Sequence, residues 1–126
     1  MPQNLKYMEI DGKLHCDNLE IFPTGILRLQ ELRILRLFNF QGLKELPNVL
    51  GHLVKGLREL TLSNCKSIKD LPYSISILRS LRVLKMDYCQ DLRHLPDDFV
   101  SLDSLEILSI KRCDSLNDLP HKFEDL

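Results

Sequence analysis

Apolar residues return along this chain at a fixed interval. Leu57, Leu60, Leu62 and Cys65 are spaced as L-x-x-L-x-L-x-x-C, and the same spacing begins again at Leu81 and at Leu105. Each copy continues with an apolar residue, a Leu-Pro step and two more apolar positions three residues apart. A period of this size indicates a solenoid, whose units bury their apolar faces against their neighbours.

Two earlier stretches follow the same pattern with insertions. About three extra residues lie between Asp11 and Asn18, and one extra residue lies near Val54-Lys55-Gly56, which leaves Leu50 and Leu53 at the inward positions. No Gly- or Ser-rich linker divides the chain. We therefore predict one domain of about five repeats, comprising residues 5–31, 32–56, 57–80, 81–104 and 105–126.

Each unit is predicted to hold a short strand, a loop and a short return element. The strand, for example at residues 60–62, alternates inward and outward side chains, and the strands of successive units should stack in parallel about 4.8 Å apart. The prolines Pro23, Pro47, Pro72, Pro96 and Pro120 share one phase and should start helical or 3-10 turns, with residues such as Ile75 and Leu78 inward.

The repeat spacing is that of the leucine-rich repeat. The predicted fold is therefore an α/β solenoid, a right-handed superhelix with a parallel concave sheet and short helical or 3-10 turns on the convex side.

The cysteines fit this scaffold better than they fit a disulfide framework. Cys65, Cys89 and Cys113 are spaced by 24 residues, Cys16 holds the same place in the first unit, and Phe40 holds it in the second. The spacing predicts an inward ladder of buried thiols. Reduced thiols and the absence of an N-x-[ST] sequon together favour the cytosol, so we expect a cytoplasmic protein.

Composition and charge narrow the classes of partner. The formal net charge of the 126 residues is −1, from 17 basic and 18 acidic side chains, so we expect no nucleic-acid partner. No apolar run approaches the ~18 residues of a membrane span, and Met1-Pro2-Gln3-Asn4 shows no secretory signal, so we expect no membrane association.

Candidate chemistry is weak. There is no G-x-x-x-x-G-K-[ST] loop, and the four histidines (His15, His52, His94 and His121) fall at different repeat phases, so we expect no nucleotide cofactor and no metal. An inward Cys89 would be inert, although Cys89-Gln90-Asp91 resembles the Cys-x-Asp of bacterial leucine-rich-repeat ubiquitin ligases. Asp97-Asp98 suits the capping of a turn. We therefore predict that the protein is not an enzyme.

Charged residues also recur at fixed phases. One set is Lys44-Glu45, Lys69-Asp70 and Arg93-His94, and another is Arg33, Arg58 and Arg82. A solvated edge is the favoured interpretation of both, and a contact column for a partner is the alternative.

The outward strand positions are the candidate functional site, because the scaffold requires apolar residues only at inward positions. Exposed apolar and aromatic side chains rimmed by charges are typical of a protein-binding patch. The alternative is that aliphatic residues there merely favour strand formation. The outward positions also hold Tyr7, Glu9, Asp11, Asn39 and Asn64. The candidate partner-binding residues are Ile34, Arg36, Phe38, Glu59, Thr61, Ser63, Val83, Lys85, Asp87, Tyr88, Ile107, Ser109, Lys111 and Arg112.

The loop after the strand resembles that of plant intracellular nucleotide-binding leucine-rich-repeat immune receptors, which use C-x-x-L-x-x-L-P. Residues 65–72 read C-K-S-I-K-D-L-P and residues 89–96 read C-Q-D-L-R-H-L-P. The resemblance implies a sensor segment in defence signalling, which restrains a nucleotide-binding switch and contacts a pathogen effector, a guarded host protein or its own nucleotide-binding domain.

A second class stays open, namely an adaptor that presents protein partners to a ubiquitin ligase or signalling enzyme. Because the last unit matches the pattern as well as the middle ones, we also expect either a segment of a longer array or self-association through uncapped ends.

Overall fold

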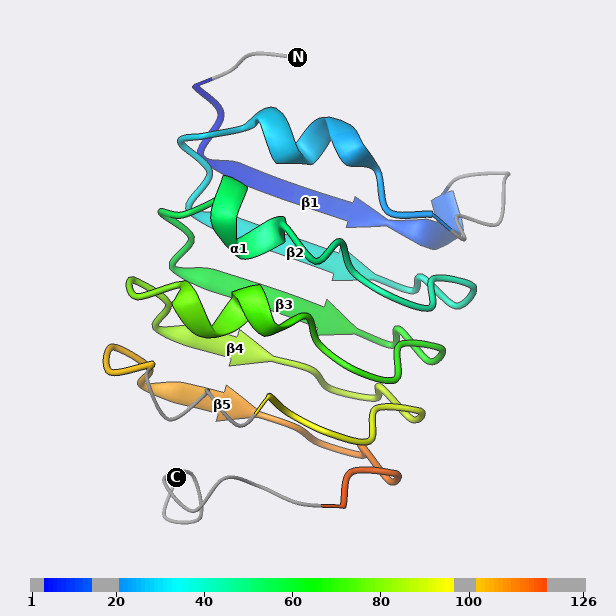
Figure 1. The fold of residues 1–126 in the computed structure, drawn as a ribbon. Coiled ribbons are helices and arrows are strands. Elements are labelled where there is room, and N and C mark those ends of the chain that lie inside the picture. Colours follow the sequence, from blue (N-terminus) through cyan, green and yellow to red (C-terminus); the bar gives the residue numbers. More distant parts are fainter. Residues whose placement is uncertain (1–3, 15–20, 97–101, 118–126) are drawn as a thin grey trace.

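The computed structural model shows a stack of five coils and describes residues 4–14, 21–96 and 102–117. Each coil gives one strand to a single sheet with the order β1-β2-β3-β4-β5, in which every neighbouring pair is parallel (Figure 1). The strands are β1 (Tyr7–Asp11), β2 (Ile34–Phe38), β3 (Glu59–Ser63), β4 (Val83–Lys85) and β5 (Ile107–Ser109). The predicted solenoid with five parallel strands is confirmed.

The register of the sheet follows the sequence period. Leu35, Leu60, Leu84 and Leu108 lie opposite one another on successive strands. The first three are fully buried and Leu108 is half-buried in the last coil. Because side chains alternate along a strand, the residues directly before and after each of these leucines project from the other face of the sheet. We call this second face the concave face.

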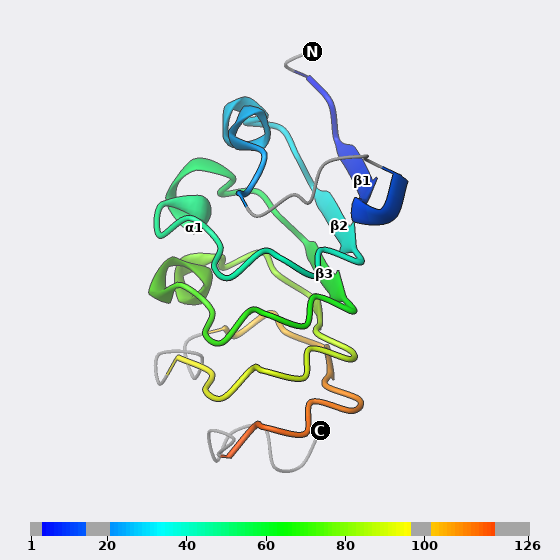
Figure 2. The same cartoon turned by 90° about the vertical axis from the view of Figure 1, so that its right-hand side faces the viewer.

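Short helical turns cover the side of the stack opposite the sheet (Figure 2). The turns η2 (Thr24–Arg28) and η3 (Tyr73–Ile77) on this side each follow a proline. The turn η1 (Gly12–Leu14), by contrast, follows β1 directly and lies beside that strand (Figure 2). The carbonyls of Pro23 and Pro72 accept hydrogen bonds from the N–H groups three residues later, at 3.2 and 3.1 Å. The prolines therefore start these turns as the sequence predicts.

The second coil departs from the predicted phase. Its turn is the α-helix α1 (Leu50–Leu53), closed by a 3.0 Å hydrogen bond from the N–H of Val54 to the carbonyl of Leu50. The extra residue is thus absorbed inside the turn, which widens from 3-10 to α. As a result Val54 is fully buried and Leu53 is 44% exposed, so the prediction that Leu53 points inward was wrong.

Successive turns pack closely at one point. The N–H of Gly51 donates to the Ser74 hydroxyl at 2.9 Å, and a Cβ on Gly51 would overlap the backbone carbonyl of Ser74. Only glycine leaves room for α1 and η3 to approach this far.

The thiol ladder is confirmed for the middle coils. Phe40, Cys65 and Cys89 are at most 1% exposed, whereas Cys113 is half-buried in the last coil. The Cys65 thiol donates to the Leu37 carbonyl at 3.8 Å, and burial raises its pKa to about 11. This thiol therefore stays protonated and unreactive at neutral pH.

Several predicted positions fall outside the described residues. They are His15, Cys16, Asp97, Asp98, Pro120 and His121. Within the described part, no helix is long and apolar enough to cross a bilayer.

Candidate functional site

The concave face presents three rows of side chains, one for each outward position of the strands. The register defines the first row as Tyr7, Ile34, Glu59, Val83 and Ile107, and the second as Glu9, Arg36, Thr61, Lys85 and Ser109. Asp11, Phe38 and Ser63 begin the third row. Ile34, Val83 and Ile107 thus share the first row, with Glu59 between the first two.

The half of this face over β1, β2 and β3 is internally paired. The Arg36 guanidinium donates from Nε to Oε2 of Glu59, and from Nη2 to Oε1 of Glu59 at 3.3 Å. It also lies 4.0 Å from the Glu9 carboxylate and 5.5 Å from the centre of the Tyr7 ring, and the Tyr7 hydroxyl donates to Glu9 at 2.9 Å. We call Tyr7, Glu9, Arg36 and Glu59 the arginine network.

The electrostatics of this network are mutually stabilising. The hydrogen bonds from Arg36 lower the pKa of Glu59, against a smaller opposing effect of burial. The same pairing raises the pKa of Arg36. Both charges therefore persist across the physiological pH range and are already compensated before any partner arrives.

Thr61 is covered by this arrangement. It is only 7% exposed, and its hydroxyl donates to Glu59 at 3.2 Å. Its short side chain lies in register between the long side chains of Arg36 and Lys85. The sequence placed Thr61 on the correct face, but the expectation that it is open to a partner was wrong.

Asp87 ties the fourth coil to the fifth. Its Oδ1 accepts hydrogen bonds from the Ser109 hydroxyl at 2.7 Å and from the backbone N–H of Lys111 at 2.9 Å. These bonds hold the chain beyond the short strands β4 and β5, where regular strand pairing has ended. Asp87 and Ser109 are therefore committed to holding coils together.

The residues just after the outward rows have a left-handed backbone. Asn39, Asn64, Tyr88 and Arg112 hold the same repeat position and have φ of 61°, 58°, 62° and 59°. Their coils continue regularly because the N–H of Asn39, Asn64 and Tyr88 each donates to a carbonyl of the next coil at 2.8–2.9 Å. Asn adopts this conformation readily, whereas other non-glycine residues are strained in it.

The two asparagines add a side-chain ladder. The Asn64 amide donates to Asn39 at 2.7 Å, and the Asn39 amide donates to Asp11 at 3.0 Å. Tyr88 and Arg112 cannot extend this ladder. Sequence reasoning missed it, although two asparagines at one repeat phase were the available signal.

The half of the concave face formed by β4, β5 and the residues just after them is different. Tyr88 is 50% exposed, Ile107 is 48% exposed, and Lys85, Lys111 and Arg112 are also exposed. None of these five side chains forms a hydrogen bond or ion pair with another described residue. We call them the recognition patch. It combines two apolar bodies with three cations.

The remaining predicted site residues are half-buried. They are Ile34, Phe38, Ser63 and Val83. Val83 lies beside Ile107 in the register, so it borders the recognition patch. Phe38 and Tyr88 lie two coils apart with the third coil between them, so the structure does not bring these two aromatic residues together.

The described residues offer little for catalysis. They contain no group of three or more His, Cys, Asp or Glu side chains arranged to hold a metal ion. Cys89 is 1% exposed, its thiol donates to the Leu62 carbonyl at 3.6 Å, and burial raises its pKa. A thiol in this state cannot act as a nucleophile.

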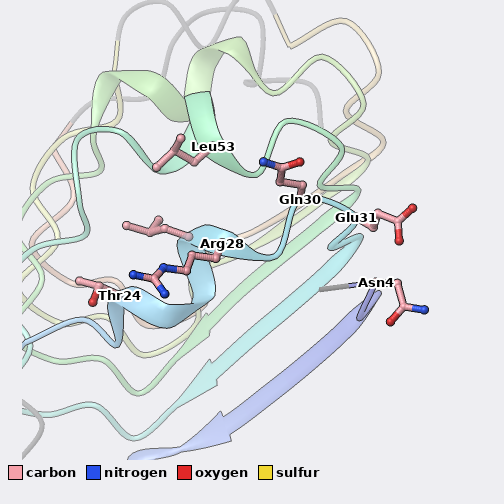
Figure 3. A pocket seen from close by; sticks show the side chains of 7 residues that line it. Asn4, Thr24, Arg28, Gln30, Glu31 and Leu53 are labelled. Carbon is pink, nitrogen blue, oxygen red and sulfur yellow. The ribbon is translucent and has the colours of Figure 1, made fainter. Parts of the chain in front are cut away.

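An open hollow of about 770 Å³ lies away from the concave face, between η2 and α1 (Figure 3). Its lining consists of Asn4, Thr24, Leu27, Arg28, Gln30, Glu31 and Leu53. These side chains come from separate elements and do not converge on one point (Figure 3). We therefore assign no chemistry to it.

Comparison with known proteins supports the fold. No protein-family model matches the sequence. No curated protein matches it as a relative. The structure is similar to that of a leucine-rich-repeat protein from Leptospira interrogans, with a TM-score of 0.66, 25% identity, and coverage of 93% of this chain and 31% of that chain.

It is also similar to the leucine-rich repeat domain of the type III effector XopL. The TM-score is 0.60 and the identity 22%, and the match covers 94% of this chain and 56% of that chain. The chain thus spans about a third of one matched structure and just over half of the other. Together with the parallel sheet and the 3-10 turns, these matches identify a leucine-rich-repeat solenoid.

Proposed function

We propose that this chain is a protein-binding leucine-rich-repeat domain and that a partner binds chiefly to the recognition patch. The observation that carries the proposal is the contrast between the two halves of the concave face. In the arginine network Arg36 is bound to Glu59 and lies 4.0 Å from Glu9, whereas Lys85, Lys111 and Arg112 form no ion pair among the described residues. Exposed cations beside apolar bodies are the groups that gain most from a partner.

The backbone conformation of two patch residues also supports binding at the recognition patch. Tyr88 and Arg112 occupy left-handed positions at which the chain elsewhere uses asparagine. Such a residue costs roughly 1 kcal/mol or more relative to a relaxed backbone. A sequence that keeps Tyr and Arg there, instead of the stabilising Asn, is consistent with a role for these two side chains outside folding.

The patch specifies the chemistry of its partner. Ile107 at the start of β5 and Tyr88 beyond the end of β4 each fit an apolar group, and the three cations fit carboxylates near these groups. The nearest carboxylate on this half of the face, that of Asp87, is already bound by Ser109 and Lys111. The proposed partner surface therefore carries two separate apolar groups together with several carboxylates.

Within this function, the repeat loop supports two finer roles. The C-x-x-L-x-x-L-P sequence favours the sensor segment of a cytoplasmic plant nucleotide-binding immune receptor, and an adaptor for a ubiquitin ligase or signalling enzyme is the second candidate. The matched structures bear on the fold and not on this choice. A nucleotide-binding domain encoded beside the repeats would favour the receptor, and an F-box or ligase domain would favour the adaptor.

Self-association through the terminal coils is a separate proposal. Leu105, Leu108 and Ile110 in the fifth coil are only half-buried, unlike their counterparts in the middle coils. Sedimentation at increasing concentration tests it, because a mass that stays constant at one chain would contradict self-association.

Site-specific photo-crosslinking tests the binding surface. A benzophenone amino acid replaces Tyr88 on the concave face in one variant and Tyr73 on the convex side in the other, since both tyrosines are exposed, at 50% and 58%. In cells, we expect a discrete protein adduct from position 88 and none of that mass from position 73. Equal adducts from both positions, or an adduct from position 73 alone, would contradict the proposal.

A further inference from the structure

The edge of the sheet at which the strands begin carries a column of cations. Lys6, Arg33, Arg58 and Arg82 each stand immediately before a strand, in four successive coils. Figure 1 shows these strand starts stacked along one side of the molecule. In the fifth coil the same position holds Glu106, which ends the column.

The backbone fixes the spacing of this column. The Lys6 carbonyl accepts from the N–H of Arg33 at 2.8 Å, the Arg33 carbonyl from that of Arg58 at 2.7 Å, and the Arg58 carbonyl from that of Arg82 at 2.8 Å. The four residues are therefore stacked at the strand separation of about 4.8 Å and span about 14 Å.

The loops that lead into the strands add to the same charge. Lys55 and Arg79 are exposed, each three residues before an arginine of the column. We call Lys6, Arg33, Lys55, Arg58, Arg79 and Arg82 the basic edge. Along residues 4–6, 30–33, 55–58 and 79–82 the only acid is Glu31.

None of these cations forms an ion pair with another described residue. The ion pairs found among those residues join Arg36 to Glu9 and to Glu59, and none involves the basic edge. One side chain is even directed along the column, because the Arg33 guanidinium lies against the backbone of Gly56, two residues before Arg58. Like charges stacked at this backbone spacing disfavour one another, and a bound anion would relieve that effect.

The opposite edge offers a natural comparison. Lys44, Lys69 and Arg93 also form a column, and the N–H of Arg93 donates to the Lys69 carbonyl at 2.8 Å. There, Glu45 and Asp70 follow Lys44 and Lys69 directly in sequence, whereas Glu59, which follows Arg58 at the basic edge, is hydrogen-bonded to Arg36. The basic edge thus gathers six cations with few free acidic neighbours, although the net charge of the chain is only −1.

From this arrangement we infer that the basic edge binds the acidic face of an α-helix of a protein partner, which runs along the stack of coils. Acidic residues at i, i+3, i+7 and i+10 of a helix span about 15 Å, close to the length of the column. Four same-side residues of an extended strand would span about 20 Å and fall out of step. The guanidinium groups of Arg33, Arg58 and Arg82 suit carboxylates, which they bind with two parallel hydrogen bonds.

This inference is independent of the recognition patch, which lies on the concave face. It also does not require the partner to be the same protein. The two surfaces can therefore be tested separately, with variants that change one and keep the other.

The test measures binding of the 126-residue chain to fluorescent helical peptides by anisotropy at low salt. One peptide carries glutamates at i, i+3, i+7 and i+10, a second has the same composition with the glutamates spread around the helix, and the third probe is single-stranded DNA of equal charge. The edge variant is Arg33→Gln/Arg58→Gln/Arg82→Gln. Its matched control is Lys44→Gln/Lys69→Gln/Arg93→Gln, which removes the same charge from the opposite edge. Circular dichroism establishes that both variants are folded.

We expect the wild type to prefer the one-face peptide, the edge variant to bind it about tenfold more weakly, and the control to stay within about threefold of the wild type. The variant Lys85→Ala/Tyr88→Ala should bind the peptide like the wild type. Equal loss in both triple variants, equal binding of both peptides, or no binding of the one-face peptide would overturn the inference. Tighter, edge-dependent binding of the DNA would overturn it in favour of a nucleic-acid partner.

Discussion

Replacing Tyr88 by Asn should stabilise the domain while removing a binding residue. Tyr88 has φ of 62°, and Asn occupies the equivalent position in two other coils. Relief of the left-handed strain is worth roughly 1 kcal/mol. The Asn64 Oδ1 accepts no hydrogen bond from a described residue, so a new amide at position 88 could extend the asparagine ladder, for about another 1 kcal/mol.

The lost ring opposes part of this gain. Tyr88 is half-exposed, so its contacts are worth at most about 1 kcal/mol. We therefore expect Tyr88→Asn to raise the free energy of unfolding by about 1 kcal/mol, or the melting temperature by about 3–5 °C. Urea denaturation followed by circular dichroism measures it.

Two further variants separate the causes. Tyr88→Ala removes the ring, keeps the left-handed strain and provides no amide, so its stability should lie between that of the wild type and about 1 kcal/mol below it, and thus below that of Tyr88→Asn. Asn64→Tyr reverses the change and breaks the ladder, so it should destabilise by roughly 1–2 kcal/mol. The reasoning is refuted if Tyr88→Asn and Tyr88→Ala are equally stable, or if Asn64→Tyr costs nothing.

Three other changes test the core, the packing of the turns and the electrostatics. Leu84→Ala should lower the free energy of unfolding by about 2–5 kcal/mol through cavity formation, whereas Lys85→Ala should leave it nearly unchanged; similar losses in urea denaturation would show that the inward and outward assignment is wrong. Gly51→Ala should destabilise by roughly 1–3 kcal/mol or more, because a Cβ overlaps the next turn, and an unchanged melting temperature would contradict that packing. The pKa of Glu59 is lowered by its arginine partner, so its contribution is complete above the ordinary glutamate pKa and is lost as pH falls through the folded-state pKa. The wild type should therefore lose more stability than Glu59→Gln between pH 6 and pH 3, and parallel melting curves would contradict the pairing.

The sequence period was sufficient to predict the architecture, because each unit places apolar residues at the same inward positions. The buried state of Leu60, Leu84, Cys65 and Cys89 follows from phase alone. The period failed where an insertion could be absorbed in more than one way. The extra residue of the second coil widened its turn into α1, and this rotated Leu53 outward and Val54 inward.

The sequence predicted which face of the sheet holds the candidate site, but not which residues of that face are open to a partner. Phase identifies which residues project outward, but it does not show which of them pair across strands. The pairing of Arg36 with Glu59 and the covering of Thr61 depend on side-chain reach in three dimensions. The left-handed backbone at Tyr88 and Arg112 was also out of reach, because neither residue type indicates it.

The basic edge shows how a chain with balanced charge can still present a one-signed surface. The sequence displays Arg33, Arg58 and Arg82 at one phase, and solvation was the favoured interpretation. The structure adds that they stack without acidic partners among the described residues. Net charge alone therefore could not exclude an acidic partner.

The central claim is tested most directly by the affinity of this chain for the partner protein that cross-linking at position 88 identifies. It is measured by titration calorimetry for the wild type, for Lys85→Ala/Tyr88→Ala in the recognition patch, and for Arg36→Ala/Glu59→Ala in the arginine network. The account predicts at least about a tenfold loss for the first variant and less than about threefold for the second. A larger loss for the arginine-network variant, or no loss for the patch variant, would contradict it.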